Sequence, residues 1–273
     1  MNRATRCEHL VVRPAKEPRM AAHVLPHDRV GNGDHAVLVV HGWFGDRTSF
    51  ASVQAHLNRS AHSYVFVDLR GYGEAVDVAG ENTVGEAADD LLATADSLGL
   101  ERFSLVGHSM GGMIAQHVLL KAPERVRRLV GISPVPASGV PFDEQTWELF
   151  AGAAERPQNR RAIIDSTSGN RLPDAWLDAM TRRSVEHTDS RAFRRILDSW
   201  SGTDIHQEVD GNPTPVLVCA GAHDKSLTPE VMKATWMQWY PNAELEVYAD
   251  AGHYAPDEVP LALVARIETF LSS

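Results

Sequence analysis

Short apolar runs alternate along most of the chain with segments whose apolar residues recur every three or four positions. The runs indicate strands buried on both faces of a sheet, and the second spacing indicates helices that cover it. Strands are expected at residues 36–40, 64–67, 103–106, 126–132, 215–220 and 245–248. Helices are expected at about residues 48–58, 87–98, 113–120, 229–239 and 261–271. This alternation predicts an α/β fold with a doubly wound, mostly parallel sheet.

The alternation stops between residues 134 and 211, where several helical patterns follow one another without strands. These helices are expected at about residues 142–155, 158–166, 173–185 and 190–199. We therefore expect an α/β core formed by residues 1–133 and 212–273. Residues 134–211, called the helical insertion below, are expected to cover the carboxyl edge of the sheet as a cap or lid.

The first 35 residues are irregular in pattern. Two short apolar runs, Leu10–Val12 and Ala21–Leu25, are candidate edge strands, although Pro14, Pro18 and Pro26 interrupt this region. Proline removes a donor from a strand ladder, so central strands are not expected here.

Composition and charge exclude several classes of function. The net charge of −10 over 273 residues argues against a nucleic-acid or anionic-membrane partner, which would require clustered Lys and Arg. No apolar run is long enough to span a bilayer, and no apolar stretch of a signal peptide follows Met1–Leu10. Two cysteines are too few for a disulfide framework. We expect a cytoplasmic protein without membrane insertion.

One candidate nucleophile stands out. Residues 103–106 lead into the pattern Gly-x-Ser-x-Gly around Ser109, and a helical pattern follows. A serine in a sharp strand-to-helix turn is the setting of a nucleophile elbow, and the small flanking glycines permit its strained backbone. The Met110 amide, at a helix N-terminus, is then placed to stabilise an oxyanion. The alternative is a glycine-rich turn whose serine only caps the helix.

A nucleophilic serine needs a general base, usually a histidine that a carboxylate holds in one tautomer. Asp224 follows the strand expected at 215–220, and His253 is the only histidine later in the chain. Singly, Asp224 is explained as a turn residue and His253 as a surface histidine. Because both follow strands at the edge where Ser109 is expected, their joint placement favours a Ser-Asp-His triad.

From about Val37 to Phe270 the chain resembles the α/β-hydrolase superfamily. The resemblance rests on His41–Trp43, Asp68–Gly73, Gly107–Gly112, Gly221–Asp224 and Gly252–His253. It implies that the residue after His-Gly, Trp43, lends its amide to the oxyanion hole with Met110, Phe44 being the alternative donor. It also implies supporting roles for His41, His108, Asp68 and Arg70.

The elbow and the oxyanion loop distinguish subclasses of this superfamily. Haloalkane dehalogenases and epoxide hydrolases carry Asp where this chain has Ser109. Prolyl aminopeptidases and the hydrolases of aromatic ring-fission products have Gly- and Pro-rich oxyanion loops, unlike His41–Trp43. The chain is most similar to small serine carboxylesterases and lactonases, including the pimeloyl-carrier-protein methyl esterases. This implies cleavage of an ester, lactone or thioester of a small, largely apolar substrate through an acyl-enzyme.

Two other functions remain open. The same triad also serves carbon–carbon or amide bond hydrolysis, and some superfamily members are non-catalytic ligand receptors. Neither a metal nor an organic cofactor is expected, because no cluster of metal-ligating residues is evident.

The helical insertion is expected to set specificity. Candidate pocket residues are Phe44, Tyr254, Phe142, Trp147, Phe150, Trp176 and Trp200, although packing of the lid against the sheet also explains many of them. The insertion also carries the pairs Arg160-Arg161, Arg182-Arg183 and Arg194-Arg195. A solvated helix face is the simplest explanation of these pairs. The alternative is recognition of an acidic substrate or an acidic carrier protein.

Overall fold

The computed structural model describes residues 21–273, and its centre is a seven-stranded sheet with the order β1-β3-β2-β4-β5-β6-β7. Its strands are β1 (His27–Val30), β2 (His35–Val40), β3 (His62–Val67), β4 (Phe103–His108), β5 (Val126–Ile132), β6 (Val216–Gly221) and β7 (Ala243–Tyr248). All neighbours pair in parallel except β1 and β3, which are antiparallel. The expected doubly wound, mostly parallel sheet is confirmed.

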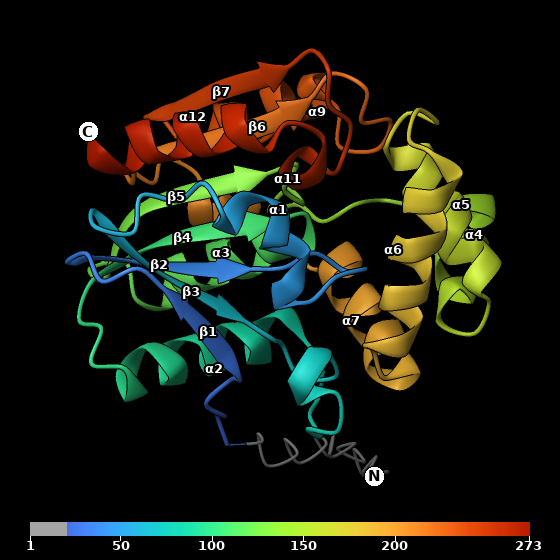
Figure 1. Cartoon of the computed structure of the whole chain (residues 1–273), viewed down its shortest axis with the longest axis horizontal. Coiled ribbons are helices and arrows are strands. Elements are labelled where there is room, and N and C mark those ends of the chain that lie inside the picture. Colours follow the sequence, from blue (N-terminus) through green and yellow to red (C-terminus); the bar gives the residue numbers. More distant parts are fainter. Residues whose placement is uncertain (1–20) are drawn as a thin grey trace, which may run out of the picture.

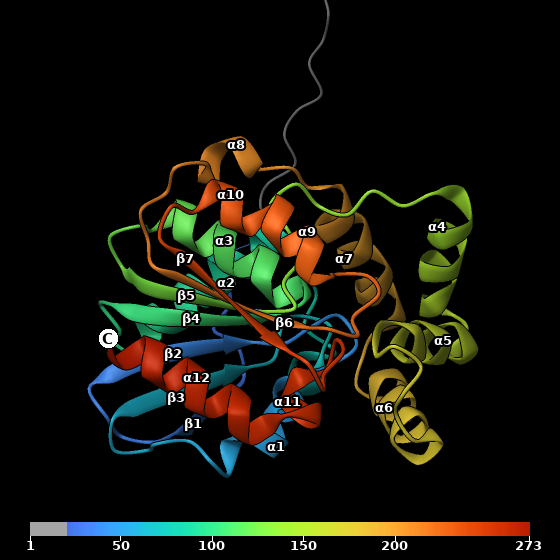
Figure 2. The same cartoon turned by 90° about the horizontal axis from the view of Figure 1, so that it is seen from above.

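Helices cover both faces of the sheet (Figures 1 and 2). One face carries α2 (Val84–Ser97), α3 (Met110–Lys121), α9 (Pro229–Ala234) and α10 (Trp236–Trp239). The other carries α1 (Ala51–Gln54), α11 (Ala255–Glu258) and α12 (Pro260–Ser272). This two-sided cover explains why the strands are apolar at consecutive positions.

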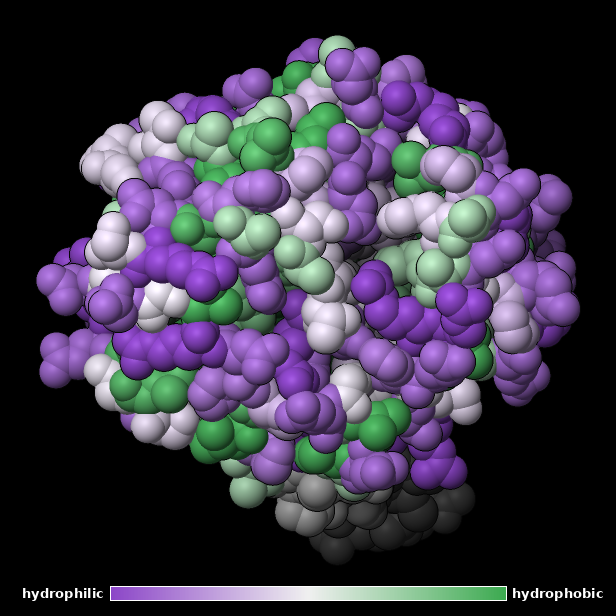
Figure 3. All heavy atoms as spheres, viewed as in Figure 1, coloured by the Kyte–Doolittle hydropathy of each residue, from purple (hydrophilic) through white to green (hydrophobic). Residues whose placement is uncertain are grey.

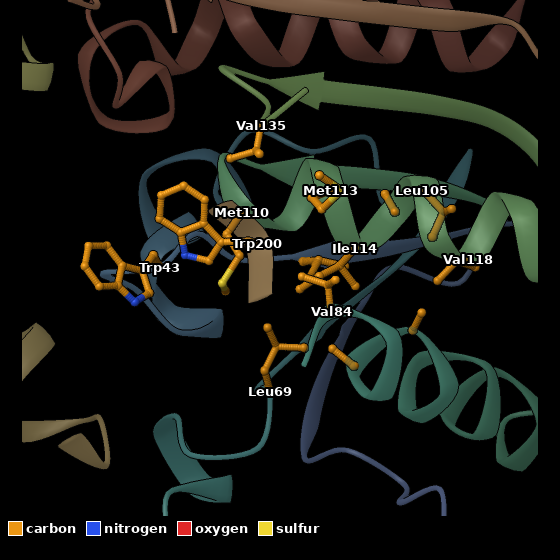
Figure 4. Packing of buried hydrophobic residues seen from close by; sticks show 14 of the residues in the cluster. Trp43, Leu69, Val84, Leu105, Met110, Met113, Ile114, Val118, Val135 and Trp200 are labelled. Carbon is orange, nitrogen blue, oxygen red and sulfur yellow. The ribbon is translucent and has the colours of Figure 1, made fainter. Parts of the chain in front are cut away.

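The core is divided by the sheet into two apolar clusters. In β2, Leu38 and Val40 pack in the cluster under α2 and α3, whereas Val37 and Val39 pack in the cluster under α12. Side chains alternate between the faces because the period of a strand is two residues. Figure 4 shows part of the first cluster, which extends along α3 to Met110 and reaches Trp43 at the carboxyl end of β2.

Between β5 and β6 the chain leaves the sheet for the helical insertion. It contains α4 (Glu144–Ala151), η3 (Gly152–Ala154), α5 (Pro157–Thr167), α6 (Asp174–Glu186), α7 (Ser190–Gly202) and α8 (His206–Val209). Figure 1 shows α4 to α7 gathered beyond the arrowheads of the central strands, where parallel sheets bind ligands. The expected helices of this region are present, and the short α8 is additional.

Several elements differ from the pattern-based expectation. Residues 21–25 form no strand, and Leu10–Val12 lies outside the described residues. The edge strand is β1, whose Asp28 and Arg29 interrupt its apolar pattern. The first helix consists of η1 (Arg47–Phe50) and the short α1, and a further short turn is η2 (Gly73–Ala75). The helix expected at 229–239 breaks at Thr235, whose φ of −124° and ψ of −89° are not helical.

The surface of the molecule is mixed in character. Figure 3 shows hydrophilic residues over most of one face, with small hydrophobic patches between them. Among residues 21–273, no helix has both the length and the apolar composition that crossing a membrane requires.

Partly or fully buried histidines make stability depend on pH. Burial lowers the pKa of His35 and of His117 to about 4 and, together with the neighbouring His253, that of His108 to about 3. In the unfolded chain these pKa values return to about 6.5. The unfolded state therefore binds more protons between pH 6.5 and pH 4, so the free energy of unfolding must fall as the pH drops through this window.

We expect the urea midpoint to be nearly constant from pH 8 to pH 7 and to decrease between pH 6.5 and pH 4. The matched variant His117→Leu removes one of these titrating groups from α3 and should show a shallower decrease. Urea unfolding followed by circular dichroism at each pH measures both chains. Parallel pH profiles for the two chains would contradict the expectation.

Candidate active site

The turn between β4 and α3 holds Ser109 in a strained backbone conformation. Its φ of 53° and ψ of −117° lie where L residues are rarely found. A Cβ at Gly107 would meet the carbonyl of Gly111, and a Cβ at Gly111 would meet the carbonyl of Val40. Only glycine fits at these two positions, so they permit the tight turn that presents Ser109 at the carboxyl end of β4.

A carboxylate and an imidazole are paired beyond the next two strands of the sheet. Asp224 follows β6 and His253 follows β7, and Asp224 Oδ2 lies 2.6 Å from His253 Nδ1. Asp224 Oδ1 accepts hydrogen bonds from the amides of Ser226 and Leu227, at 2.9 and 3.0 Å. Burial alone would raise the pKa of Asp224, but His253 and these amides outweigh it and hold the pKa below its usual value. The carboxyl therefore stays ionised beside the imidazole.

Glu258 on α11 holds the loop around His253, a role that the sequence analysis did not assign. Its carboxylate accepts from the amides of Gly252, at 2.9 Å, and Tyr254, at 3.1 Å. Arg171 of the helical insertion lies 3.3 Å from the same carboxylate. In the sequence, Glu258 appears only as an acidic residue five positions after His253. Its contact with the loop could not be inferred, because it depends on how α11 folds back on that loop.

The other polar residues of these motifs brace loops. His41 Nε2 accepts from the amide of Leu69 at 3.2 Å, and Asp68 accepts from the amides of Arg47 and Glu74. The Arg70 Nε donates to Asp90 at 2.6 Å. These contacts agree with the supporting roles that the resemblance implies.

His108, which precedes the serine, is fully buried beside the carbonyl of His253, with its Nε2 2.9 Å from that oxygen. Burial and the proximity of His253 lower the pKa of His108 to about 3. The ring is therefore neutral at physiological pH, and its hydrogen bond ties the loop of His253 to the elbow.

Two backbone amides beside Ser109 have no acceptor. Within the described part of the chain, the amide groups of Trp43 and Met110 donate no hydrogen bond. Both residues are buried, and a buried amide without an acceptor is costly. The Trp43 indole, by contrast, donates to the carbonyl of Phe193 at 2.8 Å and stacks on its ring. The Trp43 ring is thus used for packing, while the two amides have no acceptor among the described residues.

Ser109 and His253 line a largely apolar cavity that is partly open to solvent. The core contributes aromatic walls from the oxyanion loop and from the loop after β7. The helical insertion contributes further walls from α4 and α7 and the segment before α4. The aromatic residues that line the cavity are Trp43, Phe44, Phe142, Phe150, Trp200 and Tyr254.

Two candidate pocket residues do not reach this cavity. Trp147 lies on the outer groove of the insertion, where the Arg194 guanidinium sits 5.0 Å from its ring centre. Trp176 packs edge-on against Tyr254, with ring centres 5.1 Å apart, and stands behind it. Helical spacing alone does not tell which face of α4 or α6 turns inward. Within residues 21–273, no three His, Cys, Asp or Glu side chains are grouped as a possible metal site.

Comparisons with known proteins identify the fold family. The family model described as alpha/beta hydrolase fold matches residues 35–260. The 2-hydroxymuconate semialdehyde hydrolase of Pseudomonas putida is 26% identical over 95% of this chain and 96% of its own length. A thermophilic esterase from Thermogutta terrifontis superposes with a TM-score of 0.79 at 25% identity, covering 91% of this chain and 93% of that one. An esterase from Exiguobacterium antarcticum, at 19% identity and with 90% and 95% covered, shares the fold with a TM-score of 0.82.

Proposed function

Since this chain belongs to the alpha/beta hydrolase fold family, we propose that it is a serine hydrolase of carboxylic esters, lactones or thioesters. Its substrate is small and largely apolar. One observation carries the proposal: a serine on a strained elbow shares an apolar cavity with an imidazole that a buried carboxylate holds at 2.6 Å. The esterase similar to this chain over most of its length supports the ester bond as the target.

The mechanism is a two-step acyl transfer. His253 takes the proton of Ser109 as the serine oxygen attacks the ester carbonyl. The free amides of Trp43 and Met110 stabilise the resulting oxyanion. His253 then protonates the leaving alcohol and later activates the water that hydrolyses the acyl-enzyme, while the Asp224 carboxylate stabilises the imidazolium.

The helical insertion acts as the lid of this site in the proposed enzyme. Residues from α4 to α7 line the cavity together with the core, so they limit the space that is available to the acyl or alcohol group. The contact between Arg171 and Glu258 and the stacking of Phe193 on Trp43 fasten the insertion to the catalytic loops.

A second candidate function is carbon–carbon bond hydrolysis with the same residues. It is favoured by the relative named 2-hydroxymuconate semialdehyde hydrolase, which aligns with nearly the whole chain. The Gly- and Pro-rich oxyanion loop usual in hydrolases of ring-fission products is absent here, where the loop is His-Gly-Trp. We therefore prefer ester hydrolysis to carbon–carbon bond hydrolysis. A ligand receptor is the least favoured function, because ligand binding alone requires neither an ionised Asp224 nor free amides at Trp43 and Met110.

A substrate panel tests these candidates together. It contains methyl and 4-nitrophenyl esters of graded acyl length, lactones, thioesters, amides and a vinylogous 1,5-diketone ring-fission product. The ester proposal requires turnover of esters that exceeds turnover of the diketone and amides. Preference for the diketone would establish the second candidate, and no turnover together with no fluorophosphonate labelling would favour the receptor.

Glu258 gives a prediction about positioning. Glu258→Ala leaves the amides of Gly252 and Tyr254 without their acceptor, so His253 loses its fixed position. We expect kcat for the best ester to fall about 30-fold with KM within about threefold, since misplacement affects the chemical step more than ground-state binding. Glu258→Gln, which retains an acceptor oxygen, should recover most of this loss.

The matched control is Glu230→Gln, which alters an exposed side chain of α9 and should leave kcat unchanged. Urea midpoints of all variants separate misplacement of His253 from unfolding. Wild-type kcat in folded Glu258→Ala would show that the loop does not need this carboxylate.

A further inference from the structure

The cavity wall contains one cationic side chain, Arg183 of α6, among the described lining residues apart from the histidines. Arg183 is partly buried on the same turn of helix as Met180, which also lines the cavity. The remainder of the wall is mainly aromatic and aliphatic. An arginine in such a setting is unusual unless a partner neutralises it.

Within residues 21–273, Arg183 has no such partner. Its Nε is inaccessible to solvent and has no acceptor, and no carboxylate lies within ion-pair distance. Within the described residues, the one hydrogen bond of its Nη2 goes to Met180 Sδ at 3.0 Å, and a thioether is a weak, neutral acceptor. Among the described residues, the Arg183 guanidinium therefore has no anionic partner, and its buried Nε has no acceptor.

Most other arginines of the insertion's pairs are used within the fold. Arg160 is buried and donates to the carbonyls of Ala153 and Ser184. Arg161 pairs with two acidic residues of α6, and Arg194 pairs with Asp198 one turn later. Arg182 is exposed and lies outside the cavity lining. Of the three basic pairs, only Arg183 offers its charge to the site of Ser109.

We propose that Arg183 is the subsite for a carboxylate, so that the natural substrate is an ester that also carries a carboxylate group. The inference rests on the proposed ester hydrolysis and names its substrate class. A guanidinium presents parallel N–H donors that match two carboxylate oxygens, and the apolar surroundings strengthen such a bond. The carboxylate would satisfy the free Nε and neutralise the charge that the wall now holds.

An acidic residue elsewhere on the wall disfavours the opposite orientation of such a substrate. Asp257 of α11 lines the cavity and accepts a hydrogen bond from the Ser52 hydroxyl at 2.7 Å. Its charge repels a carboxylate from the side of α11 and leaves α6 as the favourable side. The carboxylate therefore points to Arg183 while the ester carbonyl lies at Ser109.

The test compares a charged ester with a neutral ester of the same shape. Monomethyl adipate carries a carboxylate where methyl 6-oxoheptanoate carries an acetyl group, and monomethyl glutarate and succinate vary the distance to the ester. Methanol release gives kcat/KM for wild type, Arg183→Met, Arg183→Lys and the control Arg182→Met, which alters the exposed neighbour on the same helix. Loss of a charge-assisted, two-point contact corresponds to a decrease of about 30- to 100-fold.

We expect wild type to prefer the best monomethyl dicarboxylate over its neutral isostere. Arg183→Met should lose about 30- to 100-fold on the charged ester and less than about threefold on the neutral one. Arg183→Lys should fall between the two because it keeps the charge but not the paired geometry. Arg182→Met should match wild type.

Equal losses on both esters would show that Arg183 only supports the fold, and the absence of any charge preference in wild type would show that there is no subsite. If no ester is turned over, the proposed ester hydrolysis is wrong, whether or not the carboxylate subsite exists. Calorimetric titration with adipate then decides the subsite: binding to wild type but not to Arg183→Met supports it, and absent or equal binding overturns it.

Discussion

Ser109→Ala is expected to reduce ester hydrolysis by about 10⁵- to 10⁶-fold and to abolish labelling by a fluorophosphonate probe. The reason is that the acyl-enzyme cannot form without the serine oxygen, even though the His253–Asp224 pair and the free amides of Trp43 and Met110 remain. Initial rates with the best ester of the panel and in-gel fluorescence of the labelled chain measure the two effects.

The matched control for this variant is Ser133→Ala. Ser133 stands just after β5, the neighbouring strand, and likewise has a positive φ, of 40°, but it is fully buried and does not line the cavity. It should keep both labelling and turnover. Residual labelling of folded Ser109→Ala would mean that another side chain is the nucleophile.

The sheet was predictable because its residues are governed by local pattern. β2, β4, β5 and β6 are buried on both faces, so their apolar runs follow from burial alone. β1 escaped prediction because an edge strand tolerates charged residues such as Asp28 and Arg29. The break at Thr235 likewise leaves no mark in the spacing of apolar residues.

The candidate site likewise has a part that the sequence predicts and a part that it does not. Ser109 and Asp224 follow the buried strands β4 and β6, and His253 follows the edge strand β7. Because all three strands run parallel, the topology of the sheet suffices to place the three residues at one edge. The walls contributed by the helical insertion depend on the rotation of each helix about its axis, which no short-range pattern encodes. Trp147 consequently faces outward, whereas Arg183, one of several similar arginines in the sequence, turns toward the cavity.

Asp224→Asn is expected to lower kcat by about 10⁴-fold with little change in the stability of the fold. The asparagine oxygen can still accept from the amides of Ser226 and Leu227. Its amide group, however, becomes a donor toward His253 Nδ1 and favours the tautomer that carries its proton on Nε2. An imidazole in that form cannot take the proton of Ser109. The variant also lacks the negative charge of Asp224 that stabilises the imidazolium.

Asp204→Asn is the matched control, because Asp204 lies 2.5 Å from His206 Nδ1 in an exposed pair outside the cavity lining. It should leave kcat unchanged. The pH-rate profile of wild type adds a second test: because the pKa of Asp224 is held below its usual value, lowering the pH toward 5 should not neutralise this carboxylate. An Asp224→Asn variant that turns over esters at the wild-type rate would mean that the orientation of His253 does not depend on this charge, and the proposed triad would fail at its acidic member.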